Sequence, residues 1–141
     1  MSKVPLTVAV ITKNEENNID ECLSSVHGWA DEIIVVDDES SDKTLERARQ
    51  YTGRVFARKM DNEGIHRNWA HAQARNPWVM VLDADEQATE ELKNEIAGAL
   101  SGTPHSCFSI PLNVYRQNMD PALGLVSGEQ NTALSQRTFQ V

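Results

Sequence analysis

The stretch Val79–Glu86, with the sequence VMVLDADE, gives the strongest indication of the fold of this chain. Its four apolar residues predict a buried strand, and a strand interior does not hold unpaired charges, so the acidic residues must lie at the carboxyl end. In open α/β sheets, ligands bind outside this end of the strands. Asp83 and Asp85 there suit a hard divalent cation, which binds oxygen ligands and shares substrate phosphates. The structural alternative is that these acids begin a helix and interact favourably with its dipole.

Strand and helix patterns alternate from residue 6 to residue 100. Short apolar runs predict the strands, and apolar residues at helical spacing predict the helices between them. The predicted strands cover residues 6–12, 33–36, 54–57 and 78–82, and the predicted helices cover residues 14–28, 44–51, 65–74 and 89–100. This order is typical of βαβ units. The sequence therefore predicts an α/β fold of three layers, with a mainly parallel central sheet and helices on both faces.

Polar residues precede three of the predicted helices. We expect Asn14, then Ser41 with Asp42, and finally Thr89 to act as N-caps, because their side chains accept hydrogen bonds from the first turn of a helix. Ser40 and Ser41 are interpreted as turn and cap residues. No His–Asp arrangement lies near them in the sequence to support a serine nucleophile.

The pattern weakens beyond Leu100. Residues 107–112 predict a further strand, in which Pro111 marks a sheet edge or a strand end. Residues 133–141 predict one more strand or an arm. An incomplete edge at residues 107–112 also predicts pairing with a second copy of the chain as a homodimer, with exchange of the segment after Tyr115.

The bulk composition is that of a soluble globular domain, with 141 residues, of which 40% are hydrophobic and 24% charged. The net charge of -8 and the scattered basic residues argue against a protein that binds nucleic acid through its phosphates. Cys22 and Cys107 have no C-x-x-C spacing and are expected to be free thiols. No signal-peptide pattern and no apolar stretch of membrane-spanning length is present, so we expect a cytoplasmic protein that works in solution or at the inner face of the membrane.

The first, second and fourth predicted strands all end in polar or acidic residues. These ends are residues 12–15 (TKNE), Asp37 with Asp38, and Asp83 with Asp85. Parallel strands bring their carboxyl ends to the same edge of a sheet, so we expect these side chains to converge. Aspartate ionises near pH ~3.9, and several carboxylates crowded together repel one another unless a cation is present. The convergence predicts a metal-assisted site for an anionic ligand.

Three stretches of the chain resemble family 2 glycosyltransferases in their order and spacing. They are Val8–Glu15 (VAVITKNE), Ala30–Thr44 (ADEIIVVDDESSDKT) and Leu82–Glu86 (LDADE), and the likeness covers roughly residues 5–100. The chain is especially similar to bacterial enzymes that build lipopolysaccharide cores and other surface glycans. The resemblance implies the GT-A nucleotide-sugar-binding fold and transfer of a sugar, with inversion, from a nucleotide donor to a glycan or lipid-linked acceptor. A UDP-sugar is the favoured donor.

The resemblance also implies a set of residues that contact the nucleotide. Thr12 and Asp38 would contact the nucleobase, while Asp37 and Glu15 would support that pocket or the ribose. Arg67 matches the position at which the family places a basic residue near the nucleotide. Residues 1–100 would therefore form the donor-binding region. Residues 101–141 would begin the acceptor side, or form a C-terminal arm, of the same domain.

A second implied set binds the metal. Asp85 would ligate Mg²⁺ or Mn²⁺, and Asp83 would bind the ribose or share the metal. The cation would hold the diphosphate and stabilise it as it leaves, which is Lewis-acid assistance.

The chain departs from the family in the region that follows the acidic motif. Inverting enzymes of this fold need a carboxylate general base there, and complete members are considerably longer. The only acidic residues after Glu95 are Asp120 and Glu129, and neither lies in a motif that matches, so both are weak candidates for the base. We therefore expect the chain to be too short for activity by itself. The alternatives are a silent or truncated nucleotide-binding module and a nucleotidyltransferase, whose glycine-rich phosphate loop is missing after the first strand.

Overall fold

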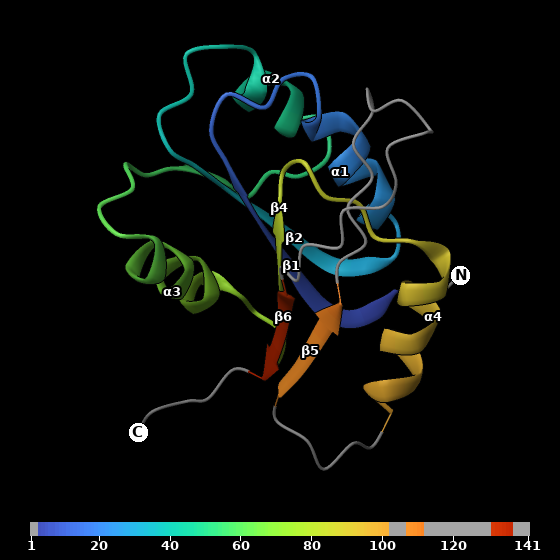
Figure 1. The fold of residues 1–141 in the computed structure, drawn as a ribbon. Coiled ribbons are helices and arrows are strands. Elements are labelled where there is room, and N and C mark those ends of the chain that lie inside the picture. Colours follow the sequence, from blue (N-terminus) through green and yellow to red (C-terminus); the bar gives the residue numbers. More distant parts are fainter. Residues whose placement is uncertain (1–2, 102–106, 112–130, 137–141) are drawn as a thin grey trace, which may run out of the picture.

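A computed structural model describes residues 3–101, 107–111 and 131–136 of the chain. Ten elements follow one another within these described residues (Figure 1). They are β1 (Val4–Thr12), α1 (Ile19–Val26), β2 (Ala30–Asp37), α2 (Thr44–Ala48), β3 (Val55–Ala57), α3 (Glu63–Gln73), β4 (Trp78–Asp83), α4 (Glu90–Ala99), β5 (Cys107–Pro111) and β6 (Asn131–Gln136).

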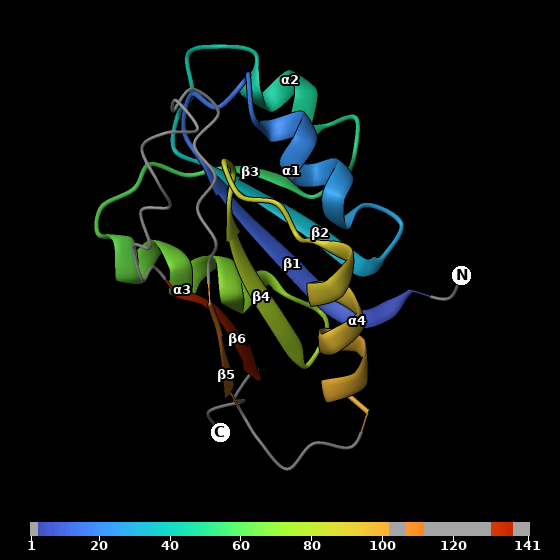
Figure 2. The same ribbon diagram turned by 45° about the vertical axis from the view of Figure 1, so that its right-hand side comes forward.

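The described strands form one sheet in the order β3–β2–β1–β4–β6–β5. Neighbours among β3, β2, β1 and β4 are parallel, whereas β6 is antiparallel to both β4 and β5. Helix α3 lies on one face of the sheet, and α1, α2 and α4 lie on the other (Figure 1, Figure 2). The predicted fold of three layers around a mainly parallel sheet is therefore confirmed.

The two faces of the sheet are covered by separate apolar clusters. Alternate residues of a strand point to opposite faces, so Val8 and Val10 pack on the side of α1 and α4, whereas Ala9 packs on the side of α3. The larger cluster includes Leu6, Val8, Val10, Ile19, Cys22, Leu23, Val26, Val35, Met80, Leu82 and Ile96. The smaller cluster includes Ala9, Ile34, Val36, Ala70, Ala74 and Val79, with Phe56 and Trp69 against it. Cys22 is a buried free thiol, as predicted.

The structure corrects two of the predicted N-caps. Asn14 does not cap α1, because that helix begins five residues later and is preceded by Asn18, whose side chain makes no capping hydrogen bond. Helix α2 is preceded by Lys43 rather than by Ser41 or Asp42, although Asp42 Oδ1 accepts a hydrogen bond from Thr44 N at 3.0 Å. The prediction for α4 is confirmed, since the side chain of Thr89 accepts a hydrogen bond from Leu92 N.

Other differences concern the lengths of elements. Helix α2 ends at Ala48 instead of residue 51, and α3 begins at Glu63 instead of residue 65. The last predicted strand or arm, 133–141, overlaps β6, which begins at Asn131 and ends at Gln136, and the rest of the predicted span lies outside the described residues. Residues 112–130, which include the start of the segment predicted to exchange between two copies, lie outside the described residues.

None of the described helices combines the length and the apolar character that crossing a membrane requires.

Candidate functional site

Strand register brings three of the predicted site residues side by side. Thr12 of β1 pairs with Asp37 of β2, and Ile11, its neighbour, pairs with Asp83 of β4. The first, second and fourth strands therefore end at one edge of the sheet, where the sequence predicted that their polar residues would converge. A candidate ligand site lies at this carboxyl edge, in agreement with the position of ligand sites in open α/β sheets.

The alternation of side chains divides these residues between the two faces. Val35 packs in the cluster beside α1, so Asp37, two residues later, points to the same face. Val36 packs beside α3, and Asp38 accordingly accepts a hydrogen bond from Met60, in the segment that precedes that helix. Adjacent aspartates thus have different surroundings, and their roles differ.

Asp37 is fully buried, and its carboxylate is held by one residue of the loop that follows it. Ser40 N donates to Asp37 Oδ2 at 2.8 Å, and Ser40 Oγ donates to Asp37 Oδ1 at 2.5 Å. Both carboxylate oxygens therefore bind the protein itself, and Asp37 shapes the loop between β2 and α2.

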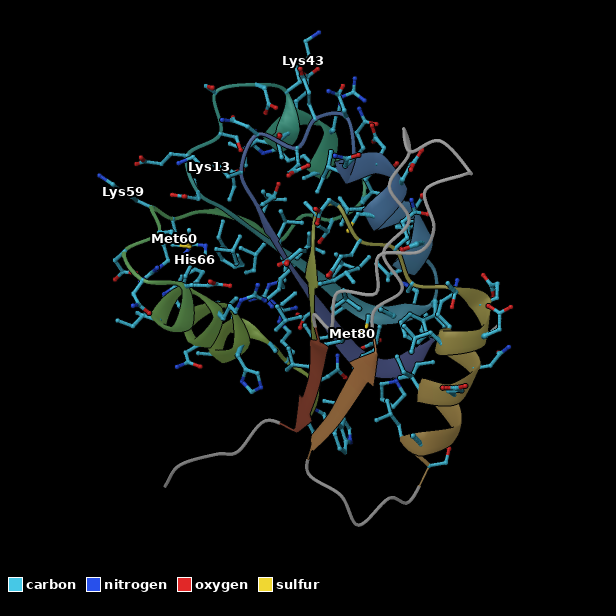
Figure 3. The ribbon with its side chains drawn as sticks, in the orientation of Figure 1. Lys13, Lys43, Lys59, Met60, His66 and Met80 are labelled. Atoms are coloured by element: carbon cyan, nitrogen blue, oxygen red, sulfur yellow. The ribbon has the colours of Figure 1, made fainter. Side chains whose placement is uncertain are left out.

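Asp38 lies beside Lys13 and Met60 at the same edge. Met60 N donates to Asp38 Oδ1 at 2.8 Å, and Lys13 Nζ lies 3.4 Å from Asp38 Oδ2. Figure 3 shows Lys13, Met60 and His66 at the end of the molecule where β1 ends and α3 begins. The hydrogen bond from Met60 N, followed by the ammonium group of Lys13, lowers the pKa of Asp38, so this carboxylate is ionised at neutral pH. Asp38 is therefore a charged hydrogen-bond acceptor at the carboxyl edge of the sheet.

Arg67 of α3 forms an ion pair with Asp83. Arg67 Nη2 donates to Asp83 Oδ1 at 2.9 Å, and Arg67 Nε donates to Glu63 Oε1 at 3.1 Å. Burial disfavours the charge of Arg67, but the carboxylates of Asp83 and Glu63 outweigh it and raise the pKa of Arg67. The sequence predictions for Arg67 and Asp83 thus refer to two residues that are in direct contact.

Asp85 lies in the turn after β4 and is exposed, while the side chain of Asp83 is 41% exposed. No group of three or more His, Cys, Asp or Glu side chains within the part of the chain that the structure describes is arranged to hold a metal ion. These two carboxylates match the needs of Mg²⁺, which binds one or two carboxylates together with substrate phosphates and water. The donor set fits a cation shared with a ligand rather than one enclosed by protein.

Thr12 and Glu15 lie close to the same edge, where Thr12 is buried and Glu15 is half-buried. Thr12 is 3% exposed, and its Oγ1 has no hydrogen-bond partner among the described residues. Glu15 N donates to Thr44 Oγ1 at 2.9 Å, and Glu15 Oε2 accepts a hydrogen bond from Asn18 Nδ2 at 2.8 Å. The backbone of Glu15 therefore joins the loops after β1 and β2.

His66 is a fully buried titratable residue beside Asp38 that the sequence did not single out for the site. Its Nδ1 lies 3.0 Å from Arg58 Nη1, and because a guanidinium group only donates, His66 Nδ1 accepts. The proton of the neutral ring is then on Nε2, which is buried and finds no partner among the described residues. Burial, followed by the nearby charge of Arg58, lowers the pKa of His66.

A separate pocket of about 420 Å³ lies at the opposite, amino-terminal edge of β2. Its charged residues include Glu32, which forms ion pairs with both Arg54 and Arg75. The hydrogen bond from Arg75 N, together with those from Thr7 and Arg54, outweighs the opposing effect of burial and lowers the pKa of Glu32. This network joins β1, β2 and the end of α3, and it contains none of the predicted site residues.

The sequence did not identify Ser40, Met60 or His66 as part of this edge, and it placed Lys13 there without assigning it a role. Each of these residues contributes through a contact with a residue distant in the sequence or through a backbone group. Neither kind of contribution produces a recognisable local pattern in the sequence. Lys13 and Ser40 do lie within the loops that follow β1 and β2, which is the one signal that marks them. Asp120 and Glu129, the weak candidates for a general base, lie outside the described residues.

Comparison with known sequences gives a consistent assignment. The model of the family described as Glycosyl transferase family 2 matches residues 7–123. A protein of Rickettsia bellii described as an uncharacterized glycosyltransferase is 36% identical over 91 residues, which are 64% of this chain and 31% of that protein. LpsC of Rhizobium meliloti, described as a lipopolysaccharide core biosynthesis glycosyltransferase, is 27% identical over 106 residues, which are 72% of this chain and 39% of LpsC. The chain spans less than half of the length of either relative.

Comparison with solved structures gives the same fold. TarS of S. aureus in complex with UDP-GlcNAc is 25% identical, with a TM-score of 0.66 over 85% of this chain and 37% of that chain. The mannosyltransferase PcManGT from Pyrobaculum calidifontis, in complex with GDP-Man and Mn²⁺, is 22% identical, with a TM-score of 0.60 over 76% of this chain and 35% of that chain. At that identity the second likeness concerns the fold alone. The predicted GT-A fold is confirmed.

Proposed function

Because this chain belongs to glycosyl transferase family 2, we propose that it is the donor-binding part of an enzyme that transfers a sugar from a nucleoside diphosphate. The acceptor is a glycan or a lipid-linked glycan of the cell surface, and the transfer proceeds with inversion. A UDP-sugar is the favoured donor, supported by the likeness to TarS in complex with UDP-GlcNAc. Work on a lipid-linked acceptor would take place at the inner face of the membrane. Residues 1–100 bind the donor, and residues 101–141 begin the acceptor side of the same domain.

The observation that carries this proposal is the arrangement of Asp38, Arg67, Asp83 and Asp85 at one edge of the sheet. Asp38 is an ionised acceptor held by Met60 N, so it suits an N–H group on the edge of a nucleobase. Arg67 supplies a positive charge for the phosphates, and it already contacts Asp83. An acidic edge that contains Lys13 and Arg67 can hold an anionic nucleotide when a divalent cation neutralises the remaining charge.

Asp85 and Asp83 would hold this cation, Mg²⁺ or Mn²⁺. The charge of Asp83 is partly balanced by Arg67, whereas Asp85 is exposed, so Asp85 is the main ligand. Asp83 is then available to accept a hydrogen bond from a ribose hydroxyl as well as to share the metal. When bound, the cation supplies Lewis-acid stabilisation of the departing nucleoside diphosphate.

Calorimetry with UDP, GDP, ADP and dTDP, with and without Mn²⁺, tests the proposal. We expect one nucleotide to bind preferentially, with Mn²⁺ increasing its affinity. Asp85→Asn should remove most of this increase, because the amide is a neutral and weaker metal ligand. Glu91→Gln is the matched control, since it removes an exposed acid from α4, away from the edge. Binding that ignores the metal, or that is unchanged by Asp85→Asn, would count against the metal site.

Incubation with labelled donors and extracted cell-surface glycans separates the three functional classes. Sugar transfer supports the glycosyltransferase, binding without transfer supports a silent nucleotide-binding module, and pyrophosphate release supports a nucleotidyltransferase. The assay also identifies the donor and the acceptor, which the site residues alone do not define.

A further inference from the structure

The loops that follow β1 and β2 are joined by hydrogen bonds that centre on Asn14. Asn14 N donates to Ser40 Oγ at 2.8 Å. Asn14 Oδ1 accepts from Ser41 N at 2.8 Å and from Ser41 Oγ at 3.3 Å. We call Asn14, Ser40 and Ser41 the loop clamp. The backbone and the side chain of one residue thus both bind the neighbouring loop, although they are separated from it by 26 or 27 positions in the sequence.

The backbone conformation of Asn14 fits this arrangement. Its φ is 50°, in the left-handed region that most L-residues avoid. Asparagine tolerates this region better than most residues because its short polar side chain forms local hydrogen bonds. Asn14 is exposed, so its place in the structure is explained by these hydrogen bonds and not by burial.

The loop clamp is anchored to the sheet through Asp37. Ser40 Oγ, which accepts from Asn14 N, donates to the buried carboxylate of Asp37 at 2.5 Å. The next residue, Asp38, donates its own N–H to Thr12 O at 2.9 Å. The backbone on both sides of the Asp38 carboxylate is therefore fixed relative to the end of β1, on one side by a strand contact and on the other by the loop clamp.

We propose that Asn14 and Ser40 are positioning residues, which hold the Asp38 carboxylate at the place where it meets the nucleobase edge of the donor. This inference rests on the proposed function, because it assigns Asp38 to the nucleobase. Neither residue contacts the donor itself. The two residues affect which base the site accepts. A carboxylate that is free to move can form hydrogen bonds with N–H groups at several positions, and it therefore distinguishes less well between different bases.

A graded series at Asn14 tests this inference in the full chain. Asn14→Asp keeps the side-chain acceptor and the tolerance for positive φ, Asn14→Gly keeps only the backbone conformation, and Asn14→Ala keeps neither. We measure dissociation constants for UDP, GDP, ADP and dTDP with Mn²⁺. Affinity for the preferred nucleotide should be close to that of the parent in Asn14→Asp and should fall by about tenfold in Asn14→Ala, as expected for loss of one or two hydrogen bonds, with Asn14→Gly between them.

The decisive measurement is the ratio of the dissociation constant of the weakest-binding nucleotide to that of the tightest-binding nucleotide. We expect this ratio to fall towards one in Asn14→Ala, whereas partial unfolding would weaken all nucleotides by one factor and leave the ratio unchanged. Asn17→Ala, which removes an exposed asparagine from the same loop, is the matched control and should retain the parent ratio.

The possible failures are distinguishable. A parent protein that binds none of the four nucleotides overturns the proposed function and this inference with it. A parent protein that binds without base preference, or an Asn14→Ala variant that keeps the parent ratio, overturns the inference alone. Loss of discrimination in Asn14→Asp equal to that in Asn14→Ala also overturns it, because the acceptor oxygen would then have no role.

Discussion

The packing and the hydrogen bond of the buried His66 side chain depend on the protonation state of its ring. Its ring has no exposed surface, and its Nδ1 accepts a hydrogen bond from the guanidinium group of Arg58. A second proton on the ring would occupy the accepting nitrogen and place a positive charge beside Arg58. The same guanidinium group lies over the ring of Trp69 and near Asp61, so His66 supports the segment between β3 and α3.

We predict that stability falls with decreasing pH because of His66. An unfolded histidine takes up a proton below about pH 6.5, whereas His66 does so only at lower pH, because burial and Arg58 lower its pKa. In this interval the unfolded state binds more protons, and the free energy of unfolding decreases by up to about 1.4 kcal/mol per pH unit. Urea unfolding between pH 5 and pH 7.5 measures the slope. His66→Asn should reduce it, and His27→Gln, at an exposed histidine, should not. Equal slopes in the parent and in His66→Asn would contradict the prediction.

Individual residues of the site also differ in whether the sequence alone could predict their roles. The aspartates at the strand ends were predictable, because an unpaired charge is disfavoured in the interior of a buried strand and the carboxyl ends of parallel strands lie at one edge. The role of Asn14 was not, since asparagine is favoured both at helix N-caps and in left-handed turns. In the structure, the start of α1 at Ile19 and the φ of 50° at Asn14 distinguish the two. Similarly, the support of Asp38 by Met60 uses a backbone N–H, which every residue except proline possesses.

Among the elements, α3 carries Arg67 to the candidate site, and its amino terminus is well defined. The side chain of Asn62 accepts hydrogen bonds from Gly64 N and Ile65 N. The first turn also carries Glu63, which pairs with Arg67. Fraying of this turn would therefore release one of the two carboxylate partners of Arg67.

We predict that Asn62→Ala destabilises the protein by about 1 kcal/mol, the typical loss when an N-cap asparagine becomes alanine. Binding of the preferred nucleoside diphosphate should weaken at the same time, because Arg67 loses the support of Glu63. Denaturant unfolding and calorimetry measure the two effects. Asn62→Asp, which retains a capping oxygen, is the control and should restore both. If Asn62→Ala loses the expected stability but binds the nucleotide with unchanged affinity, the first turn of α3 is not needed to position Arg67.

The periodicity of the sequence predicted the order of the elements along the chain, but it predicted only part of the order of the strands in the sheet. Apolar runs and helical spacing located all of the elements from β1 to α4, because each pattern is local. The position of β6 between β4 and β5 is not local, since it depends on pairing between segments far apart in the sequence. No periodic pattern encodes that choice of partner.

On the scale of the whole molecule, we predict that the 141-residue chain binds a nucleotide but transfers sugar poorly. General-base catalysis contributes typically 10²–10⁴-fold, so we expect a rate lower by about this factor than that of a family member that contains its base. Transfer of labelled sugar to extracted glycans measures the rate. Efficient transfer by the isolated chain that is abolished by Asp120→Asn or Glu129→Gln would contradict this prediction and would identify the base.

A second prediction at this scale concerns self-association. Strand β5 is the outermost strand of the described sheet on one side, and such an edge is a template for pairing with another chain. We expect a homodimer whose population rises with concentration in sedimentation equilibrium. Ser109→Lys should shift it towards monomer, because lysine on an edge strand opposes pairing. Asn17→Lys adds the same charge in an exposed loop and should leave the dimer unchanged. A monomer at all concentrations would exclude this pairing.

The place of β6 in the sheet has a consequence for how the chain folds as it leaves the ribosome. Strands β1 to β4 can assemble as soon as they emerge, and synthesis proceeds at about 5–20 residues per second from the amino terminus. Strand β5 emerges next, but it has no neighbour in the sheet until β6 arrives between it and β4. Over that interval the outer edge of β4 is open, and such an edge is prone to aggregation. The nascent chain is therefore most open to aggregation at this edge while residues 84–136 emerge.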